Sequence, residues 1–207
     1  FYIDGHVRIY HGQQANLQKK YVSRQKLCLA GTTEYWVNDQ QGKPFMFFIG
    51  DLNERVKDAI EQHIVPALIE DTINIAPGED ATQPRFTIVF DREGYEPAFF
   101  ARLWNENRIA VITYRKHVKD IWNKEYFKSV ETQLNGTKVI MQICEKQVQL
   151  GGHSFREIRK LGSNDHQTSI ITSHPTLEHA IVASQMFSRW SQENFFKYLI
   201  EEFDFDK

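Results

Sequence analysis

The sequence has little cysteine, and its two cysteines cannot build a disulfide framework. Cys28 and Cys144 both lie in apolar, strand-like runs, and neither belongs to a C-x-x-C pair of the kind that binds zinc. We expect both to be reduced thiols in the core of a cytosolic protein. No stretch approaches the roughly 20 apolar residues that span a bilayer, and no basic segment followed by an apolar one opens the chain. These absences argue against secreted and membrane proteins.

Low-complexity tracts and internal repeats are also lacking, so the chain does not read as a disordered or solenoid protein. Its 207 residues are 41% hydrophobic, 25% charged and 13% aromatic, which is typical of a globular protein with a thick core. This length suits one large or two small units. The sequence begins at Phe1 rather than at methionine, and we expect it to be a piece of a longer protein.

Charge is unevenly distributed along the chain. The formal net charge is −2, yet residues 102–160 carry 12 basic and 6 acidic side chains, and both flanking segments are net acidic. The basic side chains of this central segment include Arg115, Lys116 and Lys119. They indicate either a surface that contacts phosphates or an ordinary solvated face, and charge alone does not choose between the two.

The spacing of apolar residues predicts the element order βββαβαβ in the first half of the chain. An alternating strand over 1–10 has Asp4 on its polar face, although Asp4-Gly5 also matches a hairpin turn. The other predicted elements are strands 27–37 and 44–49, a helix over 53–72 with a kink or break at Pro66, a buried strand 86–90, a helix from Pro97 and a strand 109–114.

The second half changes character and is rich in strand-like runs. These runs cover 138–144, 147–150 and 169–172 and are separated by glycine-containing turns. A long helix then follows, with Thr176 as the predicted N-cap and an end near Glu202. We therefore predict an α/β protein with a mixed sheet of three antiparallel strands and then parallel strands, flanked by helices. Residues 1–116 and 173–207 form its core, and 117–172 form a β-rich insertion before the last helix.

Three carboxylates stand at positions where this topology can bring them together. Asp91 directly follows a buried strand, where open sheets place ligand chemistry, and Asp4 lies on a strand that the element order puts next to it. Glu193 lies on the last helix. Converging carboxylates suit a pair of Mg²⁺ or Mn²⁺ ions, which activate a nucleophile and stabilise a leaving oxygen in phosphodiester cleavage.

A purely structural interpretation of the same residues exists. Arg189, Glu193 and Lys197 are spaced for surface ion pairs along one helix face. The segment 91–94 matches a simple turn, and 27 acidic residues offer many chance triples. Spacing alone therefore does not decide whether the three acids form a site.

Three segments carry a resemblance to a known family: residues 2–6 (YIDGH), 87–95 (TIVFDREGY) and 189–197 (RWSQENFFK). Together they are similar to the catalytic core of bacterial insertion-sequence transposases of the Asp-Asp-Glu type. The resemblance covers nearly the whole chain. It implies a ribonuclease H-like fold in which a β-rich insertion precedes the helix that carries the glutamate.

By this resemblance, Asp4, Asp91 and Glu193 are the catalytic acids and the ligands of two divalent cations, Mg²⁺ or Mn²⁺. The implied reaction is hydrolysis at the ends of a transposon, followed by transfer of the exposed 3′-hydroxyl to target DNA. The predicted DNA contacts are the basic residues near Glu193 and those of the central segment: Arg189, Lys197, Arg115, Lys116 and Lys119.

The match departs from the family's signature at two positions. Met186 stands where many relatives carry a tyrosine, three residues before the arginine, and Ile200 stands where they carry a lysine, seven residues after the glutamate. These departures leave the three acids in place and fall among the DNA-end contacts of that signature.

The resemblance also implies binding partners and a cellular location. Double-stranded DNA is the expected partner, a homodimer is a further candidate, no membrane is involved, and the location is the bacterial cytoplasm in association with the nucleoid. Two other functions are compatible with the same fold. One is a stand-alone metal-dependent nuclease, and the other is a non-catalytic transposase relic or DNA-binding module.

Overall fold

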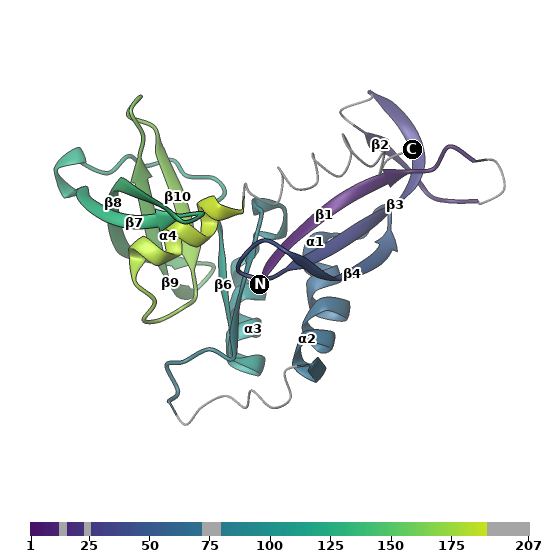
Figure 1. Cartoon of the computed structure of the whole chain (residues 1–207), viewed down its shortest axis with the longest axis horizontal. Helices are drawn as coiled ribbons and strands as arrows, with labels where there is room; N and C mark the ends of the chain where they lie inside the picture. Colours follow the sequence, from purple (N-terminus) through teal and green to yellow (C-terminus); the bar gives the residue numbers. More distant parts are fainter. Residues whose placement is uncertain (13–15, 23–25, 72–79, 190–207) are drawn as a thin grey trace.

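The chain folds around one mixed sheet (Figure 1). The computed structural model describes residues 1–12, 16–22, 26–71 and 80–189. In these residues the strand order is β2-β3-β1-β5-β6-β10-β9-β8-β7. Strand β4 lies outside this order and also pairs with β3. The strands are β1 (Tyr2–Ile9), β2 (Lys19–Val22), β3 (Leu27–Asn38), β4 (Pro44–Asp51), β5 (Phe86–Phe90), β6 (Ile109–Tyr114), β7 (Lys128–Leu134), β8 (Thr137–Leu150), β9 (His153–Leu161) and β10 (Gln167–Thr172). The predicted mixed α/β class is confirmed.

The first strand runs unbroken, so the hairpin turn considered at Asp4-Gly5 is wrong. On β1, Asp4 pairs with Trp36 and Gly5 pairs with Tyr35 of the antiparallel strand β3. A side chain at position 5 would begin 3.3 Å from the Tyr35 ring. Glycine is thus favoured there because the ring of the neighbouring strand lies against the backbone, and not because the chain turns.

The centre of the sheet changes from antiparallel to parallel pairing at β1. Strand β3 pairs antiparallel with both β4 and β1, whereas β1, β5 and β6 run parallel. Strands β5 and β6 are mostly buried and apolar, as expected of parallel strands that are covered on both faces. The arrangement sets the carboxyl end of β5 directly beside β1.

The helix predicted over 53–72 forms, and Pro66 changes its winding without breaking it. It consists of α1 (Val56–Ala59), a π-helical segment η1 (Ile60–Ile64) and α2 (Val65–Asp71). The Val65 N–H donates to the carbonyl of Ile60, five residues back. Because proline lacks an N–H and crowds the preceding turn, a wider turn just before it lets the helix continue.

The strands β7 to β10 extend the central sheet, since β10 pairs antiparallel with β6. Two-residue hairpins at Asn135-Gly136 and Gly151-Gly152 join β7 to β8 and β8 to β9, and all four residues have positive φ. The β-rich character predicted for 117–172 is thus seen as strands of the same sheet. The division into core and insertion stays a prediction.

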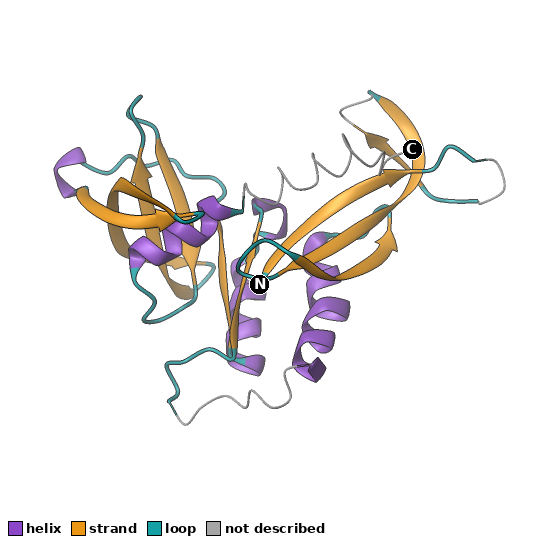
Figure 2. Ribbon diagram, in the orientation of Figure 1, coloured by secondary structure: helices purple, strands orange, loops and turns teal. Residues whose placement is uncertain are grey.

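Two layers of helices cover the sheet (Figure 2). The helices α1, α2 and α3 (Pro97–Asn107) pack on one face, where Ile3, Phe90 and Phe100 belong to a large apolar cluster. Helix α4 (His179–Ser188) packs on the other face, where Val182 and Met186 contact a second cluster. The polar side of β1 therefore lies on the same face of the sheet as α4.

The predicted N-cap at Thr176 is wrong, because α4 begins later, after Glu178. The His174 ring accepts hydrogen bonds from the backbone N–H groups of Thr176 and Leu177 at 3.3 and 3.1 Å. The ring thus binds the backbone N–H groups that would be the first free donors of a helix starting at Thr176. The segment therefore forms a turn before the helix begins. The remainder of the predicted helix, residues 190–202, lies outside the described residues.

One of the two cysteine predictions is corrected by the structure. Cys144 is buried on β8, as expected, but Cys28 is exposed near the start of β3. The apolar run around Cys28 pairs with the short strand β2 at the edge of the described sheet, which leaves the Cys28 side chain exposed. Within the described residues, no helix is long and apolar enough to cross a membrane.

Candidate functional site

Asp4 and Asp91 lie side by side on neighbouring strands. The parallel strands β1 and β5 pair Ile3 with Phe90, and the next residue on each chain segment is an aspartate. Adjacent strands are about 4.8 Å apart, so this register alone brings the two carboxyl groups close together. The juxtaposition that the predicted element order required is therefore present.

Asp91 also shapes the turn that follows β5. Its Oδ1 accepts the backbone N–H of Arg92 at 2.5 Å and caps a short 3₁₀ turn, η2 (Arg92–Gly94). The alternative that 91–94 is a turn is thus correct, yet it does not exclude a functional role. The second carboxylate oxygen, Oδ2, points to another partner.

That partner is Arg189, whose guanidinium group lies between the two aspartates. Its Nη1 is 3.1 Å from Asp4 Oδ1, and its Nη2 is 3.6 Å from Asp91 Oδ2. The arginine side chain is only 5% exposed, whereas the aspartates are 26% and 40% exposed. One buried cation thus offsets the repulsion between two neighbouring anions. A direct DNA contact by Arg189 would require its side chain to leave this pair.

Two predicted site residues, Glu193 and Lys197, lie outside the described residues. Among the described residues, no group of three histidine, cysteine or acidic side chains could hold a metal ion. The described part of the candidate site therefore consists of two acids and one arginine. The role of Glu193 as a third acid stays a prediction.

A cleft of about 810 Å³ opens beside Asp91. The end of β6, the segment that follows it and the start of β10 form its walls, together with the end of α4. The residues that bear on its chemistry are Asp91, Arg92, Arg115, Lys116, His117 and Arg189. Arg115 and Arg189 are paired with carboxylates, whereas Arg92, Lys116 and His117 add basic side chains to the lining, so this part of the cleft suits an anionic ligand.

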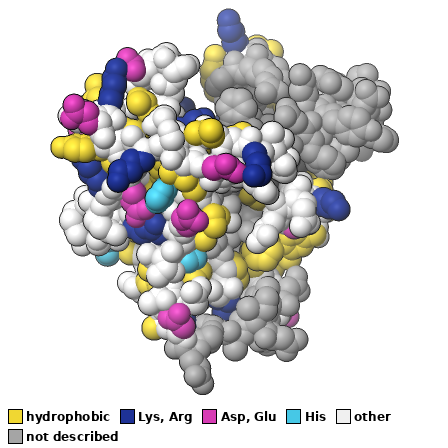
Figure 3. All heavy atoms as spheres, turned by 60° about the vertical axis from the view of Figure 1, so that its left-hand side comes forward, with side chains coloured by type: hydrophobic (Ala, Val, Ile, Leu, Met, Phe, Trp, Pro, Cys, Tyr) yellow, Lys and Arg dark blue, Asp and Glu magenta, His cyan; other side chains and the backbone are white. Residues whose placement is uncertain are grey.

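The predicted DNA contacts fall into two groups. Arg115 and Lys116 line the cleft, whereas Lys119 is exposed and does not belong to its lining. On the face that Figure 3 shows, basic and acidic side chains are interspersed and form no single basic patch. Of the basic residues predicted for the central segment, Arg115 and Lys116 thus lie in the cleft next to Asp91.

Comparison with known protein families identifies the family of this chain. The model of a family described as "Transposase protein" matches residues 1–207, which is the whole chain. The chain belongs to this transposase family. No curated protein sequence matches it significantly.

The transposase chain is also similar to a solved structure, that of piggyBac transposase in a synaptic complex with hairpin DNA, determined by cryo-EM. The TM-score is 0.50 at 12% sequence identity, and the match covers 96% of this chain and 39% of that chain. At this identity the likeness concerns the fold alone. The transposase chain thus spans well under half of the length of the protein it resembles.

Sequence reasoning missed several polar residues of the cleft, among them Arg92, His166 and Thr168. Arg92 had a usable signal, because it directly follows Asp91 at the end of a buried strand. His166 and Thr168 had none, since they reach the cleft only through the pairing of β10 with β6. Their placement depends on tertiary structure.

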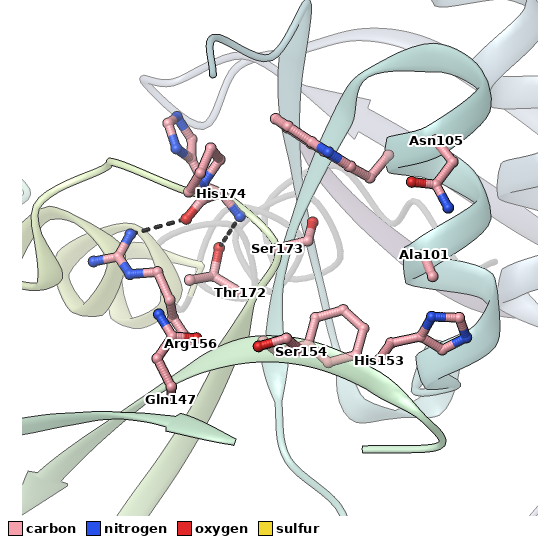
Figure 4. A pocket seen from close by; sticks show the side chains of 12 residues that line it. Ala101, Asn105, Gln147, His153, Ser154, Arg156, Thr172, Ser173 and His174 are labelled. Carbon is pink, nitrogen blue, oxygen red and sulfur yellow. Dashed lines mark hydrogen bonds between the residues drawn. The ribbon is translucent and has the colours of Figure 1, made fainter. Parts of the chain in front are cut away.

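A second cavity, of about 380 Å³, lies near the other end of β6 (Figure 4). The Arg156 guanidinium donates to the carbonyl of His174 at 2.9 Å, and the His174 N–H donates to Thr172 Oγ1 at 3.0 Å. Arg156 is also held by Glu145 through two hydrogen bonds of 2.6 and 3.0 Å. These contacts join the segment after β10 to β9 and to β10, and they join β9 to β8, so they are structural.

This arrangement predicts a pH dependence of stability. Burial and the nearby Arg156 lower the pKa of His174 below its ordinary value of 6.5. Below pH 6.5 the unfolded state therefore binds more protons than the folded state. The free energy of unfolding is highest above pH 6.5 and falls as the pH drops through the lowered pKa. One proton limits the slope to about 1.4 kcal/mol per pH unit. The measurement is the free energy of unfolding in urea between pH 5 and pH 7. We expect it to change less with pH in His174→Gln than in His11→Gln, a control at an exposed histidine. Equal pH slopes in the two variants would contradict this prediction.

Proposed function

We propose that the chain is the catalytic domain of an Asp-Asp-Glu transposase with a ribonuclease H-like fold. It would cleave DNA at the ends of a transposon and join them to target DNA. Membership of the transposase family supports the activity. The strand order β4-β3-β1-β5-β6, with three antiparallel strands followed by parallel ones, supports the fold. The assignment to bacterial insertion sequences and a homodimer stay predictions.

One observation carries this proposal: Asp4 and Asp91 occupy matching positions on adjacent parallel strands and contact the same guanidinium group. Two acids held this close need a compensating positive charge. The buried guanidinium of Arg189 supplies this charge in the metal-free chain. The pair therefore has the chemistry of a cation site.

The donor set suits divalent cations. Carboxylate oxygens are the ligands that Mg²⁺ prefers, and both aspartates remain partly exposed to incoming ions. Asp4 and Asp91 would hold the ions, with Glu193 as the proposed third acid. When bound, two divalent cations activate a water molecule and stabilise the charge on the leaving oxygen.

The chain's own residues would place the DNA. Lys116, His117 and Arg92 line the cleft beside Asp91, where they would contact phosphates of the DNA backbone. Such contacts set the position of the duplex without reading its sequence. Arg189 would balance the charge of the acids and release them as cations bind.

Nicking of a supercoiled plasmid tests this function. We expect the chain to nick the plasmid with Mg²⁺ or Mn²⁺ and to stop when EDTA removes the metal. With a short duplex that carries a free 3′-hydroxyl, we also expect a joined product. Nicking without joining would favour a stand-alone nuclease. No nicking with either metal would contradict the proposal.

A further inference from the structure

Two oppositely charged side chains are completely buried beside the cleft. Glu157 and Arg159 lie on β9, two residues apart, and both side chains have 0% exposure. Arg159 Nε donates to Glu157 Oε1 at 2.6 Å, and the Ser169 hydroxyl donates to the same oxygen at 2.7 Å. Buried charges are rare unless they are paired, so a pair at this place needs an explanation.

Each member of the pair reaches one end of the segment that follows β6. Glu157 accepts a hydrogen bond from Arg115, the first residue after β6, through its other carboxylate oxygen. Arg159 donates two hydrogen bonds of 2.9 Å to the Asp120 carboxylate and one of 2.8 Å to the Asp120 carbonyl. The chain is thus fixed at 115 and again at 120 by one connected set of charges.

Aromatic stacking reinforces the second attachment. The Arg159 guanidinium lies 4.1 Å from the centre of the Trp122 ring, which is buried. Trp122 Nε1 donates to Asp120 at 2.9 Å, and its backbone groups exchange hydrogen bonds with the Gln167 side chain. The hydrogen bond from Arg159 holds the pKa of the Asp120 carboxyl below its usual value, which keeps it ionised.

Between the two attachments lie residues 116–119, with the sequence Lys-His-Val-Lys. Lys116 and His117 line the cleft that also contains Asp91, and His117 adopts a left-handed conformation with φ of 58°. A non-glycine residue adopts such a conformation only where its surroundings fix the chain. The buried charges thus hold a short basic segment in a defined shape beside the candidate acids.

We propose that the Arg115–Glu157–Arg159–Asp120 relay positions residues 116–119 as a preformed binding segment for the phosphates of DNA. The inference rests on the proposed function and adds positioning residues to it. Glu157, Arg159 and Asp120 do not touch the DNA; they act through Lys116 and His117. Because the segment is already ordered, binding does not have to order it again.

Asp120→Asn is the sharpest test, because Asp120 is 56% exposed and the loss of its charge weakens the attachment of the segment at position 120 without opening the core. In the full chain, we expect roughly three- to tenfold weaker binding of a mixed-sequence DNA duplex and a salt dependence reduced by about one phosphate contact. Hydrogen exchange of the 116–119 amides should become faster. The KM for DNA in plasmid nicking should rise while kcat is unchanged, whereas a general loss of folded protein would lower kcat.

Two further variants complete the test, one within the relay and one as a control. Glu157→Gln removes the charge at the centre of the relay and should weaken DNA binding at least as much as Asp120→Asn. Glu145→Gln is the matched control, because it breaks the Arg156–Glu145 pair between β8 and β9 away from the cleft. We expect this control to bind DNA like the parent chain.

The outcomes separate the relay from the function on which it rests. If the parent binds duplex DNA but Asp120→Asn matches it in affinity, salt dependence and amide exchange, the relay is overturned and the proposed function stands. If the parent binds no duplex DNA, both are overturned. Faster exchange at 116–119 together with weaker binding, in a variant that unfolds like the parent, supports the relay.

Discussion

Asp91→Asn is expected to reduce Mg²⁺-dependent nicking of plasmid DNA by about three orders of magnitude, which corresponds to roughly 4 kcal/mol of transition-state stabilisation. Asparagine keeps the oxygen that caps the 3₁₀ turn after β5, so the fold should be retained. It removes the negative charge that the proposed cation site needs. The measurement is the initial rate of plasmid nicking at equal concentrations of folded protein.

Glu93→Gln is the matched control for this prediction. Glu93 is an exposed carboxylate in the same turn, two residues after Asp91, and it does not line the cleft. Its replacement changes the net charge by the same amount and should leave the nicking rate within about twofold, because exposed substitutions away from a site have small effects. Equal rates for Asp91→Asn and Glu93→Gln would rule out Asp91 as a catalytic acid.

Arg189→Gln is expected to destabilise the metal-free chain and to strengthen its response to metal. Without the guanidinium, Asp4 and Asp91 face each other uncompensated. Removal of one partner from a fully buried ion pair costs about 3–5 kcal/mol. Solvent reaches both aspartates here, so we expect a smaller loss in the free energy of unfolding, about 1–2 kcal/mol.

Mn²⁺ should reverse this loss, because a cation bound by the two acids replaces the missing positive charge. In the variant the ion also no longer has to displace the arginine, so it should bind more tightly. Denaturant unfolding with and without Mn²⁺ measures both effects, and we expect the larger Mn²⁺-induced gain in the variant. Arg55→Gln is the control, because the Arg55–Asp58 pair is exposed and its loss should change stability much less than the loss of Arg189 does. If Arg189→Gln unfolds like the parent and gains nothing extra from Mn²⁺, the charge-balancing role is wrong.

The sequence predicted the centre of the fold because local patterns determine it. Strands β5 and β6 are short apolar runs that end in polar residues, and β1 alternates clearly, so their positions follow from periodicity. The element order then placed Asp4 next to Asp91, and the strand pairing confirms that neighbourhood. The start of α4 was missed because a single ring, that of His174, takes the backbone donors of the preceding turn.

The sequence did not reveal β9 or the charges near the cleft. Strand β9 contains Arg156, Glu157 and Arg159, which are all buried, so its pattern shows neither alternation nor an apolar run. Its charges are compensated by Glu145 on the neighbouring strand β8 and by Arg115 and Asp120, which lie about 40 residues away in the sequence. Periodicity cannot detect a strand whose buried residues depend on distant partners. The position of Arg189 between the aspartates is likewise a tertiary feature.

The structure of a crystal soaked with Mn²⁺ would show whether Asp4 and Asp91 hold a metal ion, because the anomalous scattering of manganese locates the ion independently of the protein atoms. The account predicts an anomalous peak within coordination distance of carboxylate oxygens of both Asp4 and Asp91, about 2.0–2.3 Å, with the Arg189 guanidinium moved away from them. If the arginine still bridges the two aspartates and manganese binds elsewhere or not at all, the account is contradicted.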